Sequence, residues 1–317
     1  MQPHEENEGW REIKEDAHGR VTYDTMRDIA PDPMAPAQCF IEWPHGSPFA
    51  AWSSHDVDNF YNARKRVKET IANATKLRIP QAVKTLAGSD PSTLAKIADI
   101  DESLGIPSTF FLLSVPTFNG GGYTVPLTDL AIVQPHFEIA LHASYEAHMN
   151  TAKLAQEKAL LEDRMKQATG TNYAVRGVRH HYLRFKLPYT WRAQSGIFDY
   201  DSSFGWPDQI GYRGGRAEPF EAEAGLWEIP IACMDVTLLY HQREGWDYAK
   251  RLIDAVAEAG GLFTYLWHNE SLVPYSGRRP GYYEMYAKIT QYLQAKGAWF
   301  ATGAAILDVA KAQTTRS

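Results

Sequence analysis

Segments typical of helices and of strands alternate along most of the chain, and several of the helical segments end at a glycine. A helix is predicted to begin at Asp90-Pro91 and to run to Leu104, just before Gly105. Further helices are predicted over residues 151–169, 246–259 and 282–296, and a glycine follows each of them. Glycine is favoured there because it takes up the left-handed backbone conformation easily. Interleaved helices and strands predict an α/β protein with a parallel sheet and right-handed crossovers.

About eight strands are predicted. Several are uninterrupted apolar runs, which are typical of strands covered on both faces. They lie near residues 49–57, 108–114, 137–142, 174–179, 198–202, 226–232, 262–267 and 298–302. A chain of 317 residues with 44% hydrophobic content can bury a full core, and a barrel of this length is commonly one domain. We therefore predict an irregular N-terminal extension over residues 1–45, packed on a catalytic barrel over residues 46–317.

Charge and composition exclude some classes of function. A formal net charge of -6 argues against a nucleic-acid-binding protein, which needs clustered Lys and Arg. The sequence predicts neither a secretory signal nor a transmembrane segment. Cys39 and Cys233 lie far apart in no C-x-x-C spacing, as expected of reduced thiols. A cytoplasmic protein is predicted, and its oligomeric state, a homo-oligomer included, is left open.

Two aspartates end the first predicted strand. The segment at residues 51–60 reads A-W-S-S-H-D-V-D-N-F, so Asp56 and Asp58 would project from the same face of a strand at its carboxyl end. Chemistry in α/β folds is found at that edge of the sheet. Two neighbouring carboxylates repel each other unless a cation or an arginine lies between them, which favours a metal or acid/base role. In the alternative reading, one Asp caps the following helix and the other is solvated.

Polar residues also end four of the other predicted strands. They are His142, the run Arg179-His180-His181-Tyr182, the pair Asp199 and Asp201, and His268. A single histidine at a strand end is more often a satisfied rim residue than a ligand. Five strand ends that present Asp, His, Arg, Asp and His in turn indicate a functional site.

These motifs resemble, in order, those of the NodB-type polysaccharide deacetylases, which are metal-dependent carbohydrate esterases with a distorted (β/α)7 barrel. The matching stretches are S-H-D-V-D-N, L-H-A-S-Y-E, G-V-R-H-H-Y-L-R-F, F-D-Y-D-S-S-F-G and L-W-H-N-E, within residues 49–305. The similarity is closest to the bacterial branch associated with O-antigen and other surface polysaccharides.

The resemblance implies a role for each strand-end residue. Asp56 would be the general base, held by Arg179, and Asp58 and His142 would be metal ligands. The backbone N–H of Tyr182 would contribute to an oxyanion hole. Asp201 would tune His268, the general acid. The cofactor implied is a divalent metal, with zinc expected first and manganese, iron or cobalt as alternatives.

The second motif departs from the family pattern. The family has a histidine four residues after His142, where this chain has Glu146, and His148 lies two residues further on. His181 stands where the third motif usually has a proline. The third metal ligand is therefore Glu146 or His181, with His148 as a displaced alternative.

The resemblance predicts a hydrolase that removes an N-acetyl group from an amino sugar of a surface polysaccharide or its precursor. Aromatic residues at the same strand ends, among them Tyr145 and Tyr182, have faces that suit sugar C–H groups, although core packing explains many of them equally well. One rival reading is a metal-dependent hydrolase of another C–N bond, such as an imide, ureide or formamide. Another is a catalytically degenerate carbohydrate-binding relative.

Overall fold

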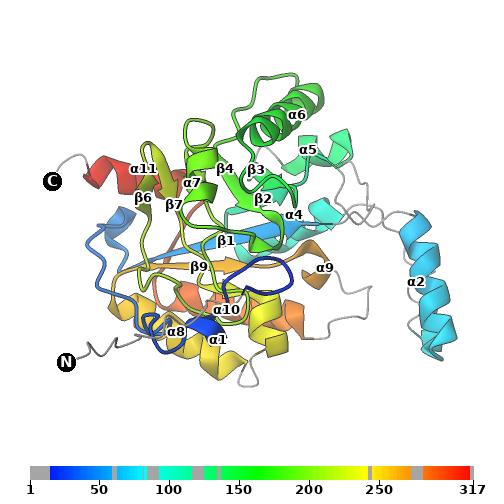
Figure 1. Cartoon of the computed structure of the whole chain (residues 1–317). Coiled ribbons are helices and arrows are strands. Elements are labelled where there is room, and N and C mark those ends of the chain that lie inside the picture. The colour runs from blue at the N-terminus through cyan, green and yellow to red at the C-terminus, as the bar shows by residue number, and fades with distance from the viewer. Residues whose placement is uncertain are drawn as a thin grey trace, which may run out of the picture.

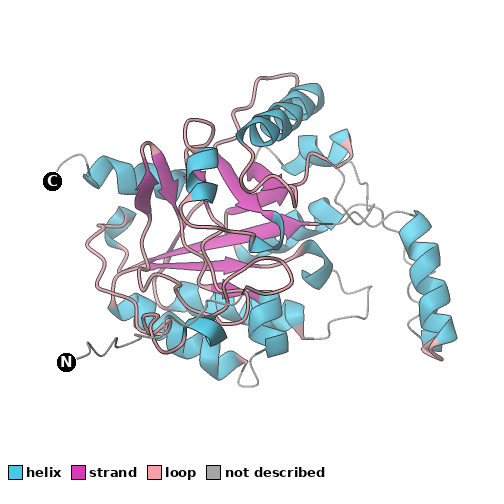
Figure 2. Cartoon of the chain, viewed as in Figure 1, coloured by secondary structure: helices cyan, strands magenta, loops and turns pink. Residues whose placement is uncertain are grey.

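The computed structural model describes residues 15–58, 63–80, 82–83, 93–115, 125–133, 137–241, 245–272 and 281–314. Helices flank one twisted sheet (Figure 1), and long loops join the strands at one of its edges (Figure 2). The predicted helix start at Asp90 and Pro91 lies outside the described residues.

The sheet has ten strands. They are β1 (Ala50–Val57), β2 (Ser108–Leu112), β3 (Glu138–Ala143), β4 (Gly177–His180), β5 (Tyr200–Asp201), β6 (Phe220–Glu223), β7 (Leu226–Glu228), β8 (Cys233–Met234), β9 (Leu262–Leu266) and β10 (Trp299–Phe300). Their order is β6-β7-β5-β4-β3-β2-β1-β9-β8, and β10 also pairs with β1. All these pairs are parallel except β6 with β7. Most strands therefore end at the same edge, as predicted.

The helices cover the sheet and follow the predicted pattern closely. They are α1 (Tyr23–Met26), α2 (Ala63–Thr75), α4 (Thr93–Leu104), α5 (Leu127–Val133), α6 (Thr151–Thr169), α7 (Tyr189–Gln194), α8 (Trp246–Glu258), α9 (Asn269–Leu272), α10 (Tyr282–Ala295) and α11 (Gly303–Thr314). Helix α6 begins after Asn150, whose side chain accepts a hydrogen bond from the N–H of Lys153. It ends at Gly170, whose φ of 73° confirms the predicted left-handed cap.

One predicted strand is wrong in its extent. The run near residues 226–232 contains only the short strand β7, which ends at Glu228, and the next strand, β8, begins at Cys233 at the other end of the sheet. Pro230, which has no N–H to donate to a strand neighbour, lies between them. Strand β7 pairs with β5, whereas β8 pairs with β9. The chain therefore crosses from one end of the sheet to the other between β7 and β8. This places Asp235, which follows Met234, on the side of the sheet where β9 lies.

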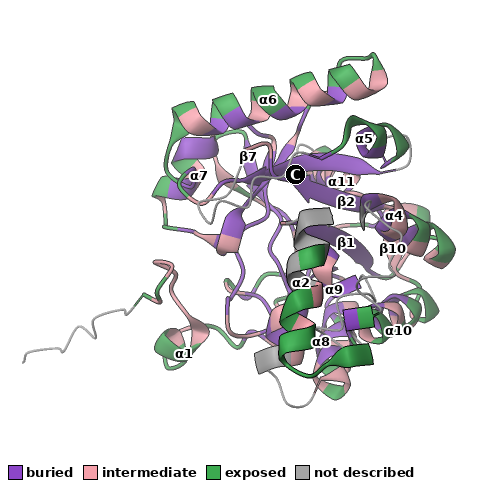
Figure 3. Ribbon diagram, turned by 90° about the vertical axis from the view of Figure 1, so that its right-hand side faces the viewer, coloured by how far each residue is buried: buried purple, intermediate pink, exposed green. Residues whose placement is uncertain are grey.

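The core lies between the sheet and its helices. All eight residues of β1 are buried, and Figure 3 shows β1 and β2 buried while the outer face of α6 is exposed. Helix α6 buries Leu154, Leu161 and Met165, which recur at the spacing expected of one helical face. Among the described helices, none is long and apolar enough to cross a membrane. The cytoplasmic location stays a prediction.

The chain before β1 makes contacts with the barrel through its backbone. Residues Glu15 and Val21 form an isolated antiparallel bridge. The N–H of Ala37 donates to the carbonyl of Gly215, and that of Cys39 donates to Ala259, at 2.8 Å each. The predicted division of the chain at residue 45 stays a prediction.

Candidate active site

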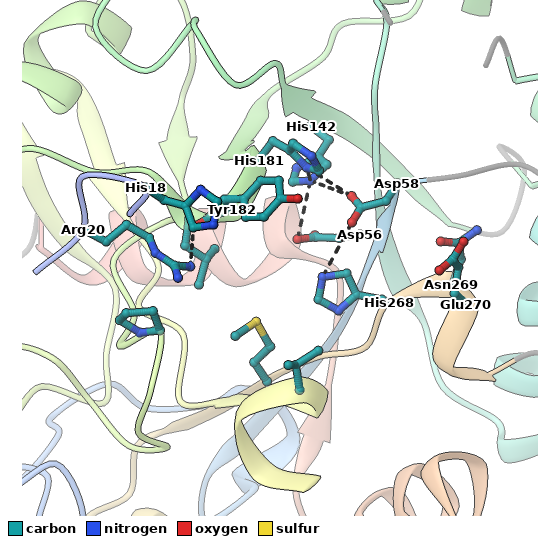
Figure 4. Close-up of a pocket in the computed structure, with 14 residues that line it drawn as sticks. His18, Arg20, Asp56, Asp58, His142, His181, Tyr182, His268, Asn269 and Glu270 are labelled. Carbon is teal, nitrogen blue, oxygen red and sulfur yellow. Dashed lines mark hydrogen bonds and ion pairs between the residues drawn. The ribbon is translucent and has the colours of Figure 1, made fainter. Parts of the chain in front are cut away.

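A cavity of about 310 Å³ opens at the carboxyl edge of the sheet (Figure 4). Its lining includes Asp56 and Asp58 from the end of β1, His142 from β3, His181 after β4 and His268 after β9. These side chains come from positions more than 200 residues apart. The parallel strands bring them together because their carboxyl ends meet at one edge.

Three side chains in this cavity form a cluster that could hold a metal ion. One ligand atom from each of Asp58, His142 and His181 lies within 4.8 Å of the other two. Oδ1 of Asp58 is 3.1 Å from Nε2 of His142 and 3.3 Å from Nδ1 of His181, and the two ring nitrogens are 3.1 Å apart. Ligand atoms about 2.1 Å from one zinc ion in tetrahedral geometry are about 3.4 Å apart. The spacing therefore fits a single divalent cation.

The protonation and hydrogen bonding of the cluster also suit a metal ion. Nδ1 of His142 lies 3.0 Å from the backbone oxygen of Arg179, to which it can donate, and this leaves the lone pair of Nε2 facing the cluster. Burial tends to raise the pKa of Asp58, but the imidazoles of His142 and His181 outweigh it and hold that pKa well below its ordinary value. Oδ1 of Asp58 is buried and, among the described residues, has no well-aligned hydrogen-bond partner. An ionised carboxylate with an unsatisfied buried oxygen is a suitable metal ligand.

A second carboxylate lies beside the cluster and is held by an arginine. Nη1 of Arg179 donates to Oδ1 of Asp56 at 2.9 Å, and Oδ2 of Asp56 is 3.8 Å from Nε2 of His142. The guanidinium is fully buried, donates through Nε to the carbonyl of Ser202 at 2.7 Å, and lies 4.0 Å from the ring centre of Phe111. Asp56 is thus fixed beside the Asp58, His142 and His181 cluster, with one carboxylate oxygen left for other contacts.

An imidazole faces the cluster from the other side of the cavity. Nε2 of His268 is 3.9 Å from Oδ2 of Asp58, and Nδ1 is 2.8 Å from Oδ1 of Asp235. Burial tends to lower the pKa of His268, but the Asp235 carboxylate more than offsets it, so that the pKa rises to about 10. The side chain can therefore keep a proton at neutral pH, as a general acid must.

Comparison with known proteins gives a match in structure only. No family model and no curated protein matches the sequence. A protein from Mycobacterium smegmatis assigned as a polysaccharide deacetylase superposes with a TM-score of 0.58 at 16% identity, over 89% of this chain and 96% of that one. The chain has the polysaccharide deacetylase fold. The predicted barrel class is confirmed, as a half-barrel whose sheet ends at β6 and β8.

Two other solved structures have TM-scores of 0.43. One is the Xyl-CE4 domain of a multidomain xylanase from the hindgut metagenome of Trinervitermes trinervoides, at 13% identity over 82% of this chain and 90% of that one. The other is a CE4 family pseudoenzyme from Bacillus anthracis, at 12% identity over 90% and 80%. These scores are too low to support an inference about this chain.

The role predicted for Asp201 is wrong. Asp201 ends β5, which pairs with β4 and β7, whereas His268 follows β9 across the half-barrel of the deacetylase fold. Oδ1 of Asp201 instead accepts a 2.6 Å hydrogen bond from Ser203. Burial raises the pKa of Asp201 to about 6. The neighbour of His268 is Asp235, which the sequence does not indicate as a strand-end residue because the strand predicted over residues 226–232 stops before β8 and the aspartate that follows it.

The other candidates in the broken second motif lie outside the cluster. Glu146 is exposed, and its carboxylate forms a 2.9 Å ion pair with Lys153. His148 is buried, with its ring centre 6.4 Å from that of His180. In the described structure, His181 is therefore the side chain that completes the cluster with Asp58 and His142.

Tyr182 follows His181 and lines the same cavity. Its φ is 63°, a left-handed conformation that is uncommon for a residue with a side chain. Such strain at a site indicates that the surrounding structure holds the turn in place. The contribution of its backbone N–H to an oxyanion hole stays a prediction.

We expect His181→Ala to weaken metal binding at least tenfold, while Glu146→Ala leaves it unchanged, because of these two side chains it is His181 that lies in the cluster. A loss of tenfold corresponds to about 1.4 kcal/mol. Titration of zinc or manganese into chelator-stripped protein measures both variants against the parent. Equal affinities for His181→Ala and the parent would contradict the three-ligand site.

We expect Asp235→Asn to move the alkaline limb of the pH dependence of kcat to lower pH. Removing the carboxylate lowers the pKa of His268, so the ring loses its proton at a lower pH as the pH is raised. The asparagine keeps a polar partner for the ring. An unchanged alkaline limb would show that Asp235 does not set the proton affinity of His268.

Proposed function

We propose that this protein is a metal-dependent hydrolase that removes an N-acetyl group from an amino sugar. The observation that supports it most is one cavity holding three ligand atoms within 4.8 Å, an arginine-held carboxylate and an aspartate-held imidazole. The deacetylase fold of the chain agrees with this chemistry. Zinc is proposed first, and manganese, iron or cobalt would also suit ligands of this kind.

In this proposal different side chains carry out different steps of amide hydrolysis. Asp58, His142 and His181 would hold a divalent cation, which supplies Lewis acidity to polarise the acetamide carbonyl and to ease deprotonation of water. Asp56 takes the proton as water attacks the carbonyl carbon, and the hydrogen bond from Arg179 holds its carboxylate in place. His268 protonates the nitrogen as the C–N bond breaks, so that acetate and a free amine leave. Without that proton the amine would be a very poor leaving group.

We further propose which molecule carries the amino sugar. The proposal that it is a surface polysaccharide or its precursor is supported by the sequence motifs alone. The comparisons do not support the O-antigen branch. The aromatic and apolar side chains of the cavity, among them Tyr182, Leu183 and Met234, suit the C–H faces of a sugar ring and the methyl of an acetyl group.

Acetate release tests this function directly. Zinc-loaded protein is incubated with N-acetylated chitooligosaccharides and with UDP-N-acetylglucosamine, and acetate is measured against Asp58→Asn as the control. We expect release by the parent and none by the variant. If the parent binds metal but instead opens hydantoin or releases formate from formamides, it is a hydrolase of another C–N bond. If it binds no metal and releases no acetate, the reading as a catalytically degenerate carbohydrate-binding relative is correct.

A further inference from the structure

The N-terminal segment at residues 15–21 forms one wall of the active-site cavity. It folds back on itself through the bridge between Glu15 and Val21. His18 and Arg20 line the cavity alongside Tyr182, and Figure 4 shows these three side chains next to one another. The segment therefore reaches the site from a part of the chain that precedes the first strand of the sheet.

Arg20 fixes this segment to the turn that follows β4. Nη1 of Arg20 donates to the backbone oxygen of Tyr182 at 2.8 Å, and Nε donates to Oδ2 of Asp16 at 2.8 Å. Nη2 is 2.7 Å from the same carboxylate oxygen, so Asp16 balances the charge of Arg20. Arg20 is thus engaged in holding the strained Tyr182 turn, and its paired charge is poorly suited to binding an anionic substrate.

His18 extends a row of rings that begins at the metal-ligand cluster. The ring centres of His142 and His181 are 5.1 Å apart, those of His181 and Tyr182 are 4.5 Å apart, and those of Tyr182 and His18 are 4.4 Å apart. The planes of His18 and Tyr182 differ by 31°. A sugar whose acetamide lies at the cluster would extend along this row, whose rings offer apolar surface to its C–H groups.

Both the backbone and the ring of His18 are held in place. Its N–H donates to Oδ1 of Asp16 at 2.9 Å, and its carbonyl accepts from Nε of Arg184 at 3.0 Å. Nδ1 lies 3.4 Å from the hydroxyl of Tyr145. Among the described residues Nε2 has no hydrogen-bond partner, which leaves this nitrogen for a ligand. Burial and then Arg20 lower the pKa of His18, so the ring stays neutral at pH 7 and can donate or accept through Nε2.

We propose that His18 is a substrate-binding residue, whose imidazole packs against the sugar and whose Nε2 hydrogen-bonds to one of its hydroxyls. Arg20 is a positioning residue that holds the wall together through Tyr182. This inference rests on the proposed function for the identity of the substrate, but it assigns a role to a segment that none of the five motifs includes. It predicts that the chain before the barrel contributes to substrate affinity.

The test uses full-length, zinc-loaded protein and tri-N-acetylchitotriose as the probe. We expect His18→Ala to raise KM about five- to tenfold, as expected for one lost hydrogen bond and ring contact, with kcat within about twofold of the parent. His18→Gln keeps a hydrogen-bonding side chain and should recover part of the loss. His45→Asn is the matched control, because His45 is exposed, lies outside the cavity, and has a φ of 61° that asparagine tolerates. Zinc affinity should be unchanged in all three.

Each outcome separates the two proposals. If the parent releases acetate and His18→Ala has the parental KM, His18 does not bind substrate and the proposed function stands. Suppose instead that the parent releases no acetate, but that calorimetry shows weaker binding of the trisaccharide by His18→Ala than by the parent. His18 then binds sugar and the proposed function fails. If the parent neither binds nor hydrolyses the trisaccharide, both proposals are overturned. A fall in kcat with unchanged KM would also contradict a binding role for His18.

Discussion

Asp56→Asn is expected to lower kcat by about 10²- to 10⁴-fold while the protein binds its metal as tightly as the parent. The reason is that Asp56 lies beside the ligand cluster without belonging to it, and its carboxylate is the group that would accept the proton of the attacking water. The asparagine oxygen can still accept the hydrogen bond from Arg179, so the fold should persist.

Asp58→Asn provides the matched comparison, because it changes a carboxylate two residues away that does belong to the cluster. We expect this variant to lose both metal and activity. Metal content by elemental analysis and kcat on the same samples distinguish the two roles. If both variants lose metal equally, the base and the ligand have been assigned incorrectly.

His268→Gln is expected to lower kcat on an N-acetylated sugar by about 10²- to 10⁴-fold with little change in metal affinity. Glutamine leaves a polar neighbour for the buried Asp235 but cannot deliver a proton to the departing amine. The loss should be much smaller on 4-nitrophenyl acetate, whose leaving group departs as an anion without needing a proton.

The ratio of the two losses is the decisive readout for His268. A structural defect would lower turnover of the amide and the ester alike. Equal losses on both substrates would therefore contradict the general-acid role and leave His268 as a rim residue that shapes the cavity. Thermal unfolding of the parent and the variant checks that the comparison is made on folded protein.

The sequence predicts most of the sheet because its strands are apolar runs separated by glycine-ended helices. Each of the eight predicted strand segments contains a strand of the structure, and Asp56 and His268 line the cavity. Arg179 contacts Asp56 as expected from the motif order. The positions of these residues can be predicted because periodicity and strand ends are local patterns in the sequence.

The features that the sequence does not predict depend on tertiary structure. The order of the strands decides that Asp235, and not Asp201, contacts His268. The choice between Glu146 and His181 depends on the direction of one side chain after β4, where Tyr182 takes a left-handed φ. The contact of Arg20 with Tyr182 joins positions 162 residues apart. No periodic pattern in either segment indicates such a contact.

The most direct test of the central claim is a metal titration of the chelator-stripped parent, with acetate release from an N-acetylated sugar measured at every point. Since Asp58, His142 and His181 form one cluster, activity should rise in proportion to bound metal and level off at about one equivalent per chain. The same titration of Asp58→Asn should give neither tight binding nor activity. Full activity in the metal-free parent, or parental binding by Asp58→Asn, would contradict the account.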